Sequence, residues 1–476
     1  MGKNKILSGI SWSFAEKLLT DLVSTVITIV LSRILMPEDY GLVALVTIFI
    51  TISSIFVTTG LGTALVRDKN ATEEQMATIF YLNVILGVVI YVFLFLCAPL
   101  IADYRGNTEL VALVRVLGLK IPISSVYNIQ HAHVKKKMDF RLFFWSSFIG
   151  TVMSGVVGIT MAYMGFGAWA LVWSTLTDNI MDSIVLFFTT KWFPKPVLKI
   201  KECSSMIDFG FKVLVKEFIN RVYAQLRGLI IGLKYSSADL AYNTKGQKFP
   251  SMFIEIVNTT VIRVMLPALS EIQDDKDKMR FIIKTSTQLT MFVIVPIMMG
   301  LFATADNFIT ILLTDKWIGA VPYIRIYCLV FMIQPLCVID ERVLEAYGLG
   351  NTLIKKQILD TVISLGAIVL ALIYYDGAIY IAFSLVVCTF IGVFLNIYLA
   401  ARETDYGILD HIKDNNSIFM IAIIMGIVVF LMGRIDLNVF VSFGLQIVVG
   451  VIVYAGLALV FKLEPAMYII DFLKKK

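Results

Sequence analysis

Long runs of apolar residues, each close to the length of a membrane span, recur from one end of this chain to the other. A helix that crosses the hydrocarbon core of a bilayer needs about 20 predominantly apolar residues. This pattern predicts fourteen membrane-spanning helices, the first, seventh and eighth being the most polar. They lie at residues 10–35, 41–66, 77–101, 110–133, 141–164, 167–190, 206–233, 238–264, 282–313, 318–346, 351–375, 377–401, 417–433 and 438–461.

The distribution of lysine and arginine over the connections supports an even number of spans with both termini in the cytoplasm. Cytoplasmic connections of membrane proteins carry an excess of these residues. With the N-terminus inside, the cytoplasmic connections contain 24 of the 41 Lys and Arg residues. The opposite side contains five, which are Arg33, Arg105, Lys234, Lys316 and Arg434. One extra or missing helix would destroy this alternation.

Composition agrees with a polytopic membrane protein that has little sequence left for a soluble domain. The 476 residues are 58% hydrophobic and 16% charged, whereas soluble domains are about 45–50% apolar and about 25% charged. The net charge of +6 follows from the excess of cytoplasmic cations, so it gives no reason to expect a nucleic-acid partner. The five scattered cysteines predict no disulfide framework.

Two polar connections divide the chain into four parts. Residues 1–190 form a predicted N-lobe of six spans, and residues 191–205, with Pro194 and Pro196, form a cytoplasmic linker. Residues 206–401 form a predicted C-lobe of six spans. Residues 402–476 contain a connector, the last two spans and a cytoplasmic tail. We therefore expect an all-α protein with two six-helix lobes and two C-terminal helices.

The seventh span carries a stripe of cations in an otherwise apolar segment. At 100° per residue, Lys212, Lys216, Asn220, Tyr223 and Arg227 fall within one face of the helix. Each cation at the bilayer centre costs roughly 2.5–3.5 kcal/mol, so the stripe should face protein or water. We interpret it as the lining of a cavity for anionic cargo; the alternative is a set of ion pairs with other helices.

Further cations in and near the spans are candidates for the same role. Lys245, Lys248 and Glu255 share a face of the eighth span, which Pro250 is expected to break or kink. Arg263 lies near the cytoplasmic end of that span, where it either contacts cargo or extends to the interface. Lys120, just before Pro122 in the fourth span, completes the predicted binding set of Lys212, Lys216, Arg227, Lys245, Lys248, Arg263 and Lys120.

Carboxylates inside the spans are candidates for carrying a coupling H+ or Na+. Asp21 in the first span and Glu255 in the eighth are the predicted ion-coupling residues. The alternatives are ion pairs, of Asp21 with Lys120 or a cation of the second bundle, and of Glu255 with Lys248. Asp178 and Asp182 form another intramembrane pair, spaced i, i+4.

Several other polar groups are interpreted as structural. Glu217 and Arg221 have the spacing of an i, i+4 ion pair. The charged end of span ten, from Asp340 to Glu345, together with Asp360 predicts interfacial bridges that act as a gate or as staples. His131 and His133 lack the further ligands of a metal site. No nucleotide-binding or catalytic motif occurs, so we predict that the protein has no cofactor and is not an enzyme. Active transport would then need an ion gradient or the gradient of the substrate itself.

Five stretches, in order along the chain, carry a resemblance to a known family. The chain resembles the polysaccharide transporter branch of the multidrug/oligosaccharidyl-lipid/polysaccharide superfamily, the Wzx-type flippases. The similar segments are Leu31–Gly41 (LSRILMPEDYG), Gly60–Val66 (GLGTALV), Gly165–Val172 (GFGAWALV), Pro267–Asp275 (PALSEIQDD) and Leu312–Trp317 (LLTDKW).

The resemblance implies a MATE-like fold whose two lobes enclose a V-shaped cavity, with alternating access. It implies an undecaprenyl-pyrophosphate-linked oligosaccharide as cargo, moved from the inner to the outer leaflet of a bacterial plasma membrane. Membrane lipids and the polymerase and glycosyltransferases of the same pathway are the expected partners. Relatives often have an acidic residue just before the Ile-Gly that closes span seven, where this chain has Arg227. This difference indicates a more acidic glycan.

Three alternatives stay open at this point. A cation-coupled multidrug exporter of the same superfamily should have an acidic or aromatic cavity, against which the cationic stripe argues. A membrane polysaccharide polymerase or ligase would need a long external loop with catalytic residues, whereas no connection on that side exceeds about a dozen residues when the spans are placed as above. A receptor or scaffold without transport is not excluded by the residue pattern.

Overall fold

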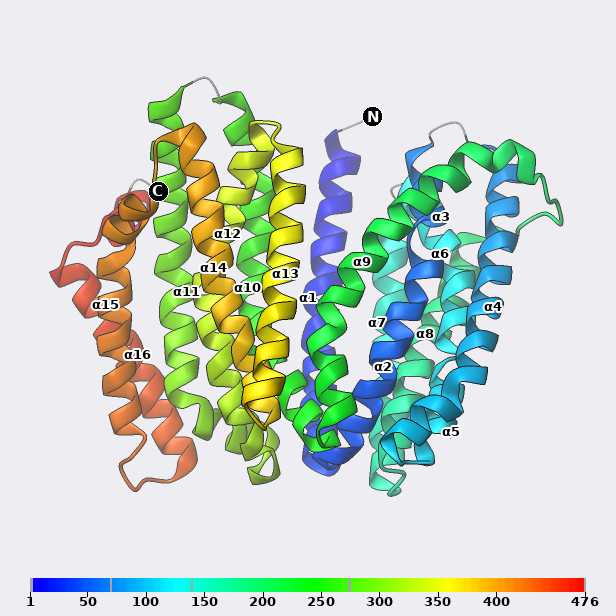
Figure 1. Cartoon of the computed structure of the whole chain (residues 1–476), viewed down its shortest axis with the longest axis horizontal. Helices are drawn as coiled ribbons and strands as arrows, with labels where there is room; N and C mark the ends of the chain where they lie inside the picture. Colours follow the sequence, from blue (N-terminus) through cyan, green and yellow to red (C-terminus); the bar gives the residue numbers. More distant parts are fainter. Residues whose placement is uncertain (1–2, 69–70, 138–139, 273–274, 475–476) are drawn as a thin grey trace. The chain divides into compact units, whose positions relative to one another are not determined.

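The computed structural model describes residues 3–68, 71–137, 140–272 and 275–474, and every regular element in these ranges is a helix. The chain forms two compact units, residues 1–241 and 242–476, whose helices are labelled in Figure 1. We describe each unit by itself. The predicted all-α architecture is therefore confirmed.

The first unit contains the helices of the predicted N-lobe and one more long helix. Its helices are α1 (Lys3–Ile34), α2 (Pro37–Thr58), α3 (Leu61–Arg67), α4 (Glu73–Arg105), α5 (Glu109–Leu117), α6 (Lys120–Lys137), α7 (Phe140–Tyr163), α8 (Ala168–Thr190), the short 3-10 helix η1 (Ile200–Cys203) and α9 (Ser204–Lys234). Two predicted spans are each divided into two helices, 41–66 into α2 and α3 and 110–133 into α5 and α6. At the first division Gly60 has φ = +66°, a conformation that glycine adopts readily.

The second unit contains most of α10 and all later helices. They are α10 (Ser237–Glu271), α11 (Lys276–Leu313), the 3-10 helix η2 (Asp315–Ala320), α12 (Val321–Ala346), α13 (Gly350–Tyr374), α14 (Ala378–Thr404), α15 (Ile408–Met432), α16 (Val439–Val460) and α17 (Glu464–Lys474). The short α17 lies in the predicted tail, where the hydropathy pattern indicated no element. Tyr406 and Ile339 belong to a buried apolar cluster that α10, α11, α12 and α14 share.

Eleven helical segments among the described residues are long and apolar enough to cross a membrane. The three other predicted spans correspond to α1, α9 and α10, which are helices of 32, 31 and 35 residues. These three are the predicted spans with the most polar sequences. The chain is thus a multi-span membrane protein, and the count of fourteen stays a prediction that the structure is compatible with.

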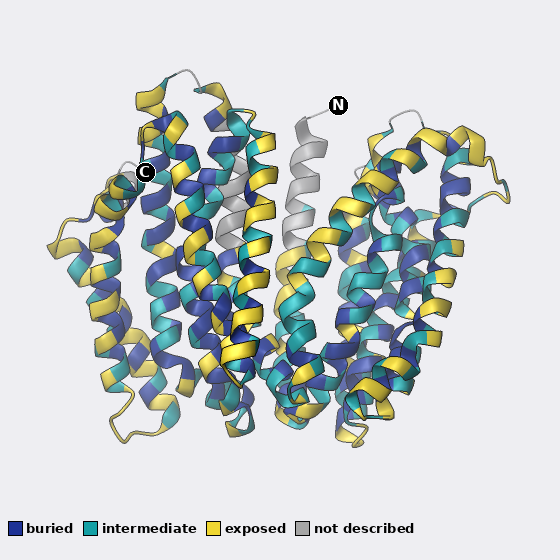
Figure 2. Cartoon of the chain, viewed as in Figure 1, coloured by how far each residue is buried: buried dark blue, intermediate teal, exposed yellow. Residues whose placement is uncertain are grey.

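Large apolar side chains lie exposed along whole helix faces, as contact with lipid requires. On α13 the exposed fractions are 61% for Ile354, 61% for Val362 and 68% for Ile373. Figure 2 shows the corresponding run of exposed positions along this helix. In a protein surrounded by water, an apolar face of this length would indicate an interaction site; here the surrounding hydrocarbon accounts for it.

The predicted linker packs against the first unit instead of extending as a loose connection. Trp192 is 9% exposed and lies edge-on to Phe80 of α4, with ring centroids 6.0 Å apart. Lys199 lies 2.5 Å from the Glu74 carboxylate, and its hydrogen bond to Glu74 raises the pKa of the Lys199 ammonium. Cys203, fully buried, continues this packing into the start of α9.

Candidate functional site

Helix α9 carries the predicted cationic stripe, and it packs on α2 and α3 of the first unit. Phe218 meets Phe56 of α2, with ring centroids 5.5 Å apart. Gly228 and Gly232 lie against Ile48 and Leu45 of the same helix, and Gly210 lies against Gly60 at the start of α3. Small residues at these crossings let the helices approach closely.

The end of α9 is held by an arginine from α4. The Arg105 guanidinium donates hydrogen bonds to the carbonyl oxygens of Leu233, at 3.3 Å, and Tyr235, at 2.6 Å. The last carbonyls of a helix have no partner within the helix, and a cation there is also favoured by the helix dipole. The compact units divide after residue 241, whereas the predicted lobes divide near 190–206. The contacts of α2, α3 and α4 with α9 account for this difference.

The cationic stripe lies on the face of α9 away from these contacts. Lys212, Lys216 and Asn220 are exposed, and Tyr223 and Arg227 are half-buried. In Figure 2 few positions of α9 are buried; those that are include Gly210 and Gly232 on the packed face. Within the first unit, therefore, the ammonium groups of Lys212 and Lys216 are not enclosed by packed side chains.

Two details of α9 differ from the sequence interpretation. Lys212 has an acidic neighbour, because its Nζ lies 2.6 Å from the Asp208 carboxylate one turn earlier. The i, i+4 spacing is the signal that would have identified this pair. The pair is exposed, so it contributes little to stability. Conversely, the structure forms no ion pair between Glu217 and Arg221, both of which it describes, and that predicted pair is wrong.

The predicted cations of α10 differ in how deeply they are buried. Lys245 is 4% exposed, with its Nζ 5.4 Å from the centre of the Trp317 ring. Lys248 is half-buried and Glu255 exposed. The side chain of Arg263 lies outside the described residues. The helix runs without interruption past Pro250, so the break allowed for at this proline does not occur.

In the first unit the structure brings together polar groups from four helices. His131 of α6 contacts the Asp182 carboxylate of α8 at 3.3 Å. Glu16 of α1 accepts a hydrogen bond from Ser147 of α7 at 3.2 Å and interacts electrostatically with Asp182, His131 and Asp21.

The neighbouring Lys120 of α6 is half-buried and interacts electrostatically with Asp178 of α8. Asp178 also accepts a hydrogen bond from Thr151 at 3.4 Å. Asp178 and Asp182 are half-buried, while the predicted coupling residue Asp21 is exposed. The sequence showed the spacing of the two aspartates, but it did not show that α6 supplies a cation and an imidazole to them.

The charged end of α12 forms the predicted interfacial bridges. Lys356 of α13, 7% exposed, lies 3.0 Å from Glu341 of α12 and 2.8 Å from Asp360 on its own helix. Asp340 lies 3.6 Å from His411 of α15, and both residues are buried. These contacts join α12, α13 and α15 at one end of the second unit. The partners Lys356 and His411 were not predicted, because nothing in their spacing relates them to α12.

Comparison with known proteins identifies relatives over most of the chain. A family model described as polysaccharide biosynthesis protein matches residues 30–322. The succinoglycan biosynthesis transport protein ExoT of Rhizobium meliloti is 24% identical over 79% of this chain and 75% of its own. The teichuronic acid biosynthesis protein TuaB of Bacillus subtilis is 24% identical over 72% of each chain. The lipopolysaccharide biosynthesis protein WzxC of Escherichia coli is 23% identical over 70% of this chain and 68% of its own.

Solved structures share the fold at low sequence identity. The inward closed conformation of the lipid II flippase MurJ has a TM-score of 0.73 and 16% identity, covering 95% of this chain and 98% of its own. An inward-facing multidrug resistance MATE transporter has a TM-score of 0.59 and 15% identity, covering 81% of this chain and 94% of its own. The predicted MATE-like fold is thereby confirmed.

Proposed function

This chain belongs to the polysaccharide biosynthesis protein family, and we propose that it is a flippase that moves a lipid-linked acidic oligosaccharide across the bacterial plasma membrane by alternating access. The names of its relatives concern succinoglycan, teichuronic acid and lipopolysaccharide synthesis. A cargo of the same chemical class, a glycan carried on undecaprenyl pyrophosphate, is the substrate that we assign to this protein.

The exposed stripe on α9 is the observation that carries this proposal. Lys212 and Lys216 are exposed and Arg227 is half-buried on a helix whose other face packs on α2 and α3. Three cations that faced hydrocarbon would cost about 8–10 kcal/mol, whereas water or an anionic group removes this cost. Pyrophosphate and uronic acids are anions that lysine and arginine bind by charge and hydrogen bonds.

We assign distinct roles to the other predicted cations. Lys248, half-buried on α10, stays in the proposed binding set, as does Arg263. Lys245 is left out, because direct contact with cargo requires an accessible ammonium group and this one lies in the core against Trp317. Lys120 is assigned to the carboxylates of α8, since it interacts with Asp178.

Coupling to H+ or Na+ is proposed to use the carboxylates of the first unit. One charge that moves down a potential of 100 mV yields about 2.3 kcal/mol. Asp182 of α8 is half-buried, contacts His131 of α6 and interacts with Glu16 of α1. Loss or gain of a charge on Asp182 would therefore change the electrostatic interactions among α1, α6 and α8. Asp21 belongs to the same group through Glu16. Glu255 of α10 is the alternative coupling residue.

We further propose that both termini lie in the cytoplasm and that the protein transports without catalysing a reaction. Its partners, besides the cargo and membrane lipids, would be the polymerase and glycosyltransferases that make and use the same glycan.

Charge reversal in the cell tests the proposed function. In a strain that lacks this protein, lipid-linked oligosaccharide should accumulate and surface polymer should be lost. Lys216→Glu and Arg227→Glu should fail to restore the polymer although the protein reaches the membrane in normal amount. Full complementation by both variants would contradict a role of the stripe in transport.

The multidrug exporter is the rival within the superfamily. It predicts that expression of this protein raises resistance to cationic dyes, whereas the flippase proposal predicts no change. Extension of a labelled lipid-linked sugar by the purified protein would instead indicate the polymerase or ligase.

A further inference from the structure

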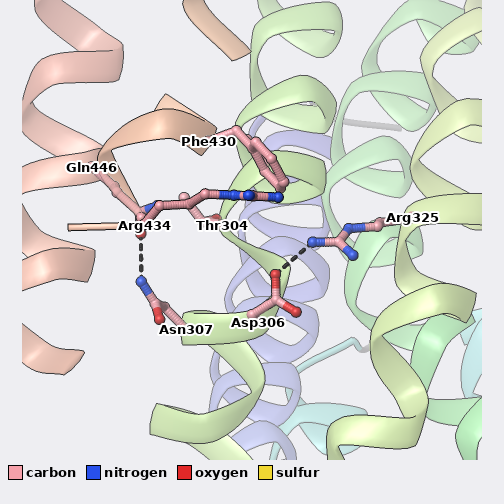
Figure 3. A pocket seen from close by; sticks show the side chains of 9 residues that line it. Thr304, Asp306, Asn307, Arg325, Phe430, Arg434 and Gln446 are labelled. Atoms are coloured by element: carbon pink, nitrogen blue, oxygen red, sulfur yellow. Dashed lines mark hydrogen bonds and ion pairs between the residues drawn. The ribbon is translucent and has the colours of Figure 1, made fainter. Parts of the chain in front are cut away.

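The second unit contains a cavity of about 330 Å³. None of the residues assigned to transport lies in its wall. Its size is at the lower end of the range for small-molecule sites. It lies among α11, α12, α15 and α16 (Figure 3). The lining residues that could contact a ligand through polar or aromatic groups include Asp306, Asn307, Arg325, Phe430, Arg434 and Gln446.

Two guanidinium groups reach this cavity, that of Arg325 on α12 and that of Arg434 just after the end of α15. Figure 3 shows Arg325 and Arg434 approaching from opposite sides, with the Phe430 ring next to the tip of Arg434. The carbon of the Arg434 guanidinium lies 5.2 Å from the centre of the Phe430 ring, and that of Arg325 lies 5.9 Å from the same centre. Both distances are within the range of cation–π attraction.

The charges around the cavity do not balance. Arg325 pairs with Asp306 and donates from Nε to the carbonyl oxygen of Phe302 at 3.3 Å. Among the described residues, the Arg434 guanidinium has neither a carboxylate partner nor a hydrogen-bond acceptor. Two cations and one carboxylate leave a net charge of +1, which one monovalent anion would balance.

Hydrogen-bonded side-chain amides form one wall of the cavity. Asn307 of α11 donates to the side-chain oxygen of Gln446 at 2.8 Å, and Gln446 of α16 donates to the carbonyl oxygen of Val429 at 3.0 Å. A Cβ atom at Gly433 would lie 2.4 Å from Nε2 of Gln446, so a larger residue there would displace this amide. These contacts join α11, α15 and α16 beside the cavity.

The surroundings indicate that the anion belongs to a lipid. Ile427 and Leu431 of α15 are 55% and 59% exposed, and Phe440 of α16 is 67% exposed, so the two helices that carry Phe430 and Gln446 also expose apolar side chains. On the expected topology the connection between α15 and α16 lies outside the cytoplasm, where lysine and arginine are rare. The positive-inside bias therefore does not explain two arginines at this cavity. We propose that the cavity binds the phosphate group of an anionic membrane phospholipid, whose acyl chains lie along α15 and α16.

Lipid-dependent stability of the purified full-length protein tests this proposal. The protein in neutral detergent is titrated with phosphatidylglycerol, with phosphatidylcholine of the same acyl chains, or with inorganic phosphate, and its melting temperature is followed. Phosphatidylglycerol should raise the melting temperature, whereas phosphatidylcholine and millimolar phosphate should not. Arg434→Gln should weaken the apparent affinity for phosphatidylglycerol about tenfold, the effect of losing one charge-assisted contact.

Arg402→Gln is the matched control. Like Arg434, Arg402 is exposed and lies over an aromatic ring four positions earlier. Its guanidinium carbon is 4.7 Å from the centre of the Tyr398 ring, and it lies outside the cavity. Its response to phosphatidylglycerol should equal that of the wild type. An unchanged affinity in Arg434→Gln, or an equal response to phosphatidylcholine, would overturn the site. Competition by inorganic phosphate would overturn the lipid and indicate a soluble anion.

Discussion

At the scale of single residues, the half-buried Asp182 is the group that we propose for ion coupling. It contacts His131 at 3.3 Å, and one of its carboxylate oxygens, Oδ1, is buried without a hydrogen-bond partner among the described residues. A neutral amide cannot take up or release a coupling proton. We therefore expect Asp182→Asn to abolish most of the stimulation of transport by an ion gradient, while cargo binding persists.

The measurement compares translocation in proteoliposomes with and without an imposed proton or sodium gradient. Glu255→Gln, at the exposed alternative on α10, serves as the control and should respond to the gradient like the wild type. If Asp182→Asn keeps the full response while Glu255→Gln loses it, the coupling group lies in the second unit.

Much of the candidate site at this scale was predictable, and the rest depended on contacts between distant segments. Periodicity alone placed Lys212 and Lys216 on one face, because the angle between helical residues is fixed. It also indicated the charged end of α12. The burial of Lys245 against Trp317 and the contact of Lys356 with Glu341 join helices far apart in sequence. No local pattern encodes which helices become neighbours.

At the scale of elements, the close crossing of α9 over the start of α3 depends on two glycines. A Cβ atom at Gly60 would lie 2.7 Å from the Gly210 carbonyl oxygen, and Gly60 has φ = +66°. Gly60 has ψ = −91°, a sparsely populated conformation outside the left-handed helical region. We expect Gly60→Ala to destabilise the protein by more than the about 1–3 kcal/mol that such backbone strain costs, because α9 must also move away.

Thermal unfolding of the purified variant measures this effect. Gly106→Ala is the control, since Gly106 has φ = +62° but nothing within 4 Å of the place that an added Cβ atom would occupy. Gly106 is in the left-handed helical region, so this variant should show a loss of at most about 1–2 kcal/mol. Equal losses of stability in the two variants would mean that the α3–α9 contact does not constrain α9.

The other end of α9 depends on Arg105, whose hydrogen bonds reach the carbonyl oxygens of Leu233 and Tyr235. Arg105→Ala should cost about 1.5–3 kcal/mol, the usual contribution of a hydrogen bond from a charged group. Hydrogen exchange should increase in the last turn of α9 and remain normal in α7. Unchanged exchange in that turn would show that Arg105 is not its anchor.

The existence of α9 was predictable, but its contacts with α2 and α3 were not. The polar stretch Lys191–Glu202 has the composition of a linker, so the sequence suggested that a new lobe begins after it. Trp192 and Cys203 instead bury themselves against α4, and the glycines of α9 fit against α2 and α3. Apolar residues within a polar segment were the available signal.

At the scale of the whole molecule, the charge distribution predicts which connections face the cytoplasm. Labelling of single cysteines in intact cells tests this orientation. In a variant without the native cysteines, Asp436→Cys places a thiol between α15 and α16, and Lys201→Cys places one before α9. A membrane-impermeant maleimide should label the first and not the second, because the positive-inside rule places residue 201 in the cytoplasm. Labelling of the second alone would reverse the proposed orientation.

The same scale shows how far hydropathy determines the fold. It predicted every long helix, since each must satisfy its own backbone hydrogen bonds in lipid. It did not predict the divisions at Gly60 and between α5 and α6, or the α17 helix, because these depend on local backbone conformation and on packing at the ends of spans.

Translocation by the purified protein is the most direct test of the central claim, that the exposed cations of α9 engage an anionic cargo. Proteoliposomes would contain the lipid-linked oligosaccharide isolated from the native host, and a membrane-impermeant glycosidase would report its appearance on the other leaflet. Wild-type protein and Arg221→Glu, an exposed cation of α9 outside the stripe, should translocate the cargo at the same rate. Lys216→Glu should reduce the rate at least about tenfold, corresponding to the loss of 1.4 kcal/mol or more. Equal rates for Lys216→Glu and the wild type would contradict the account.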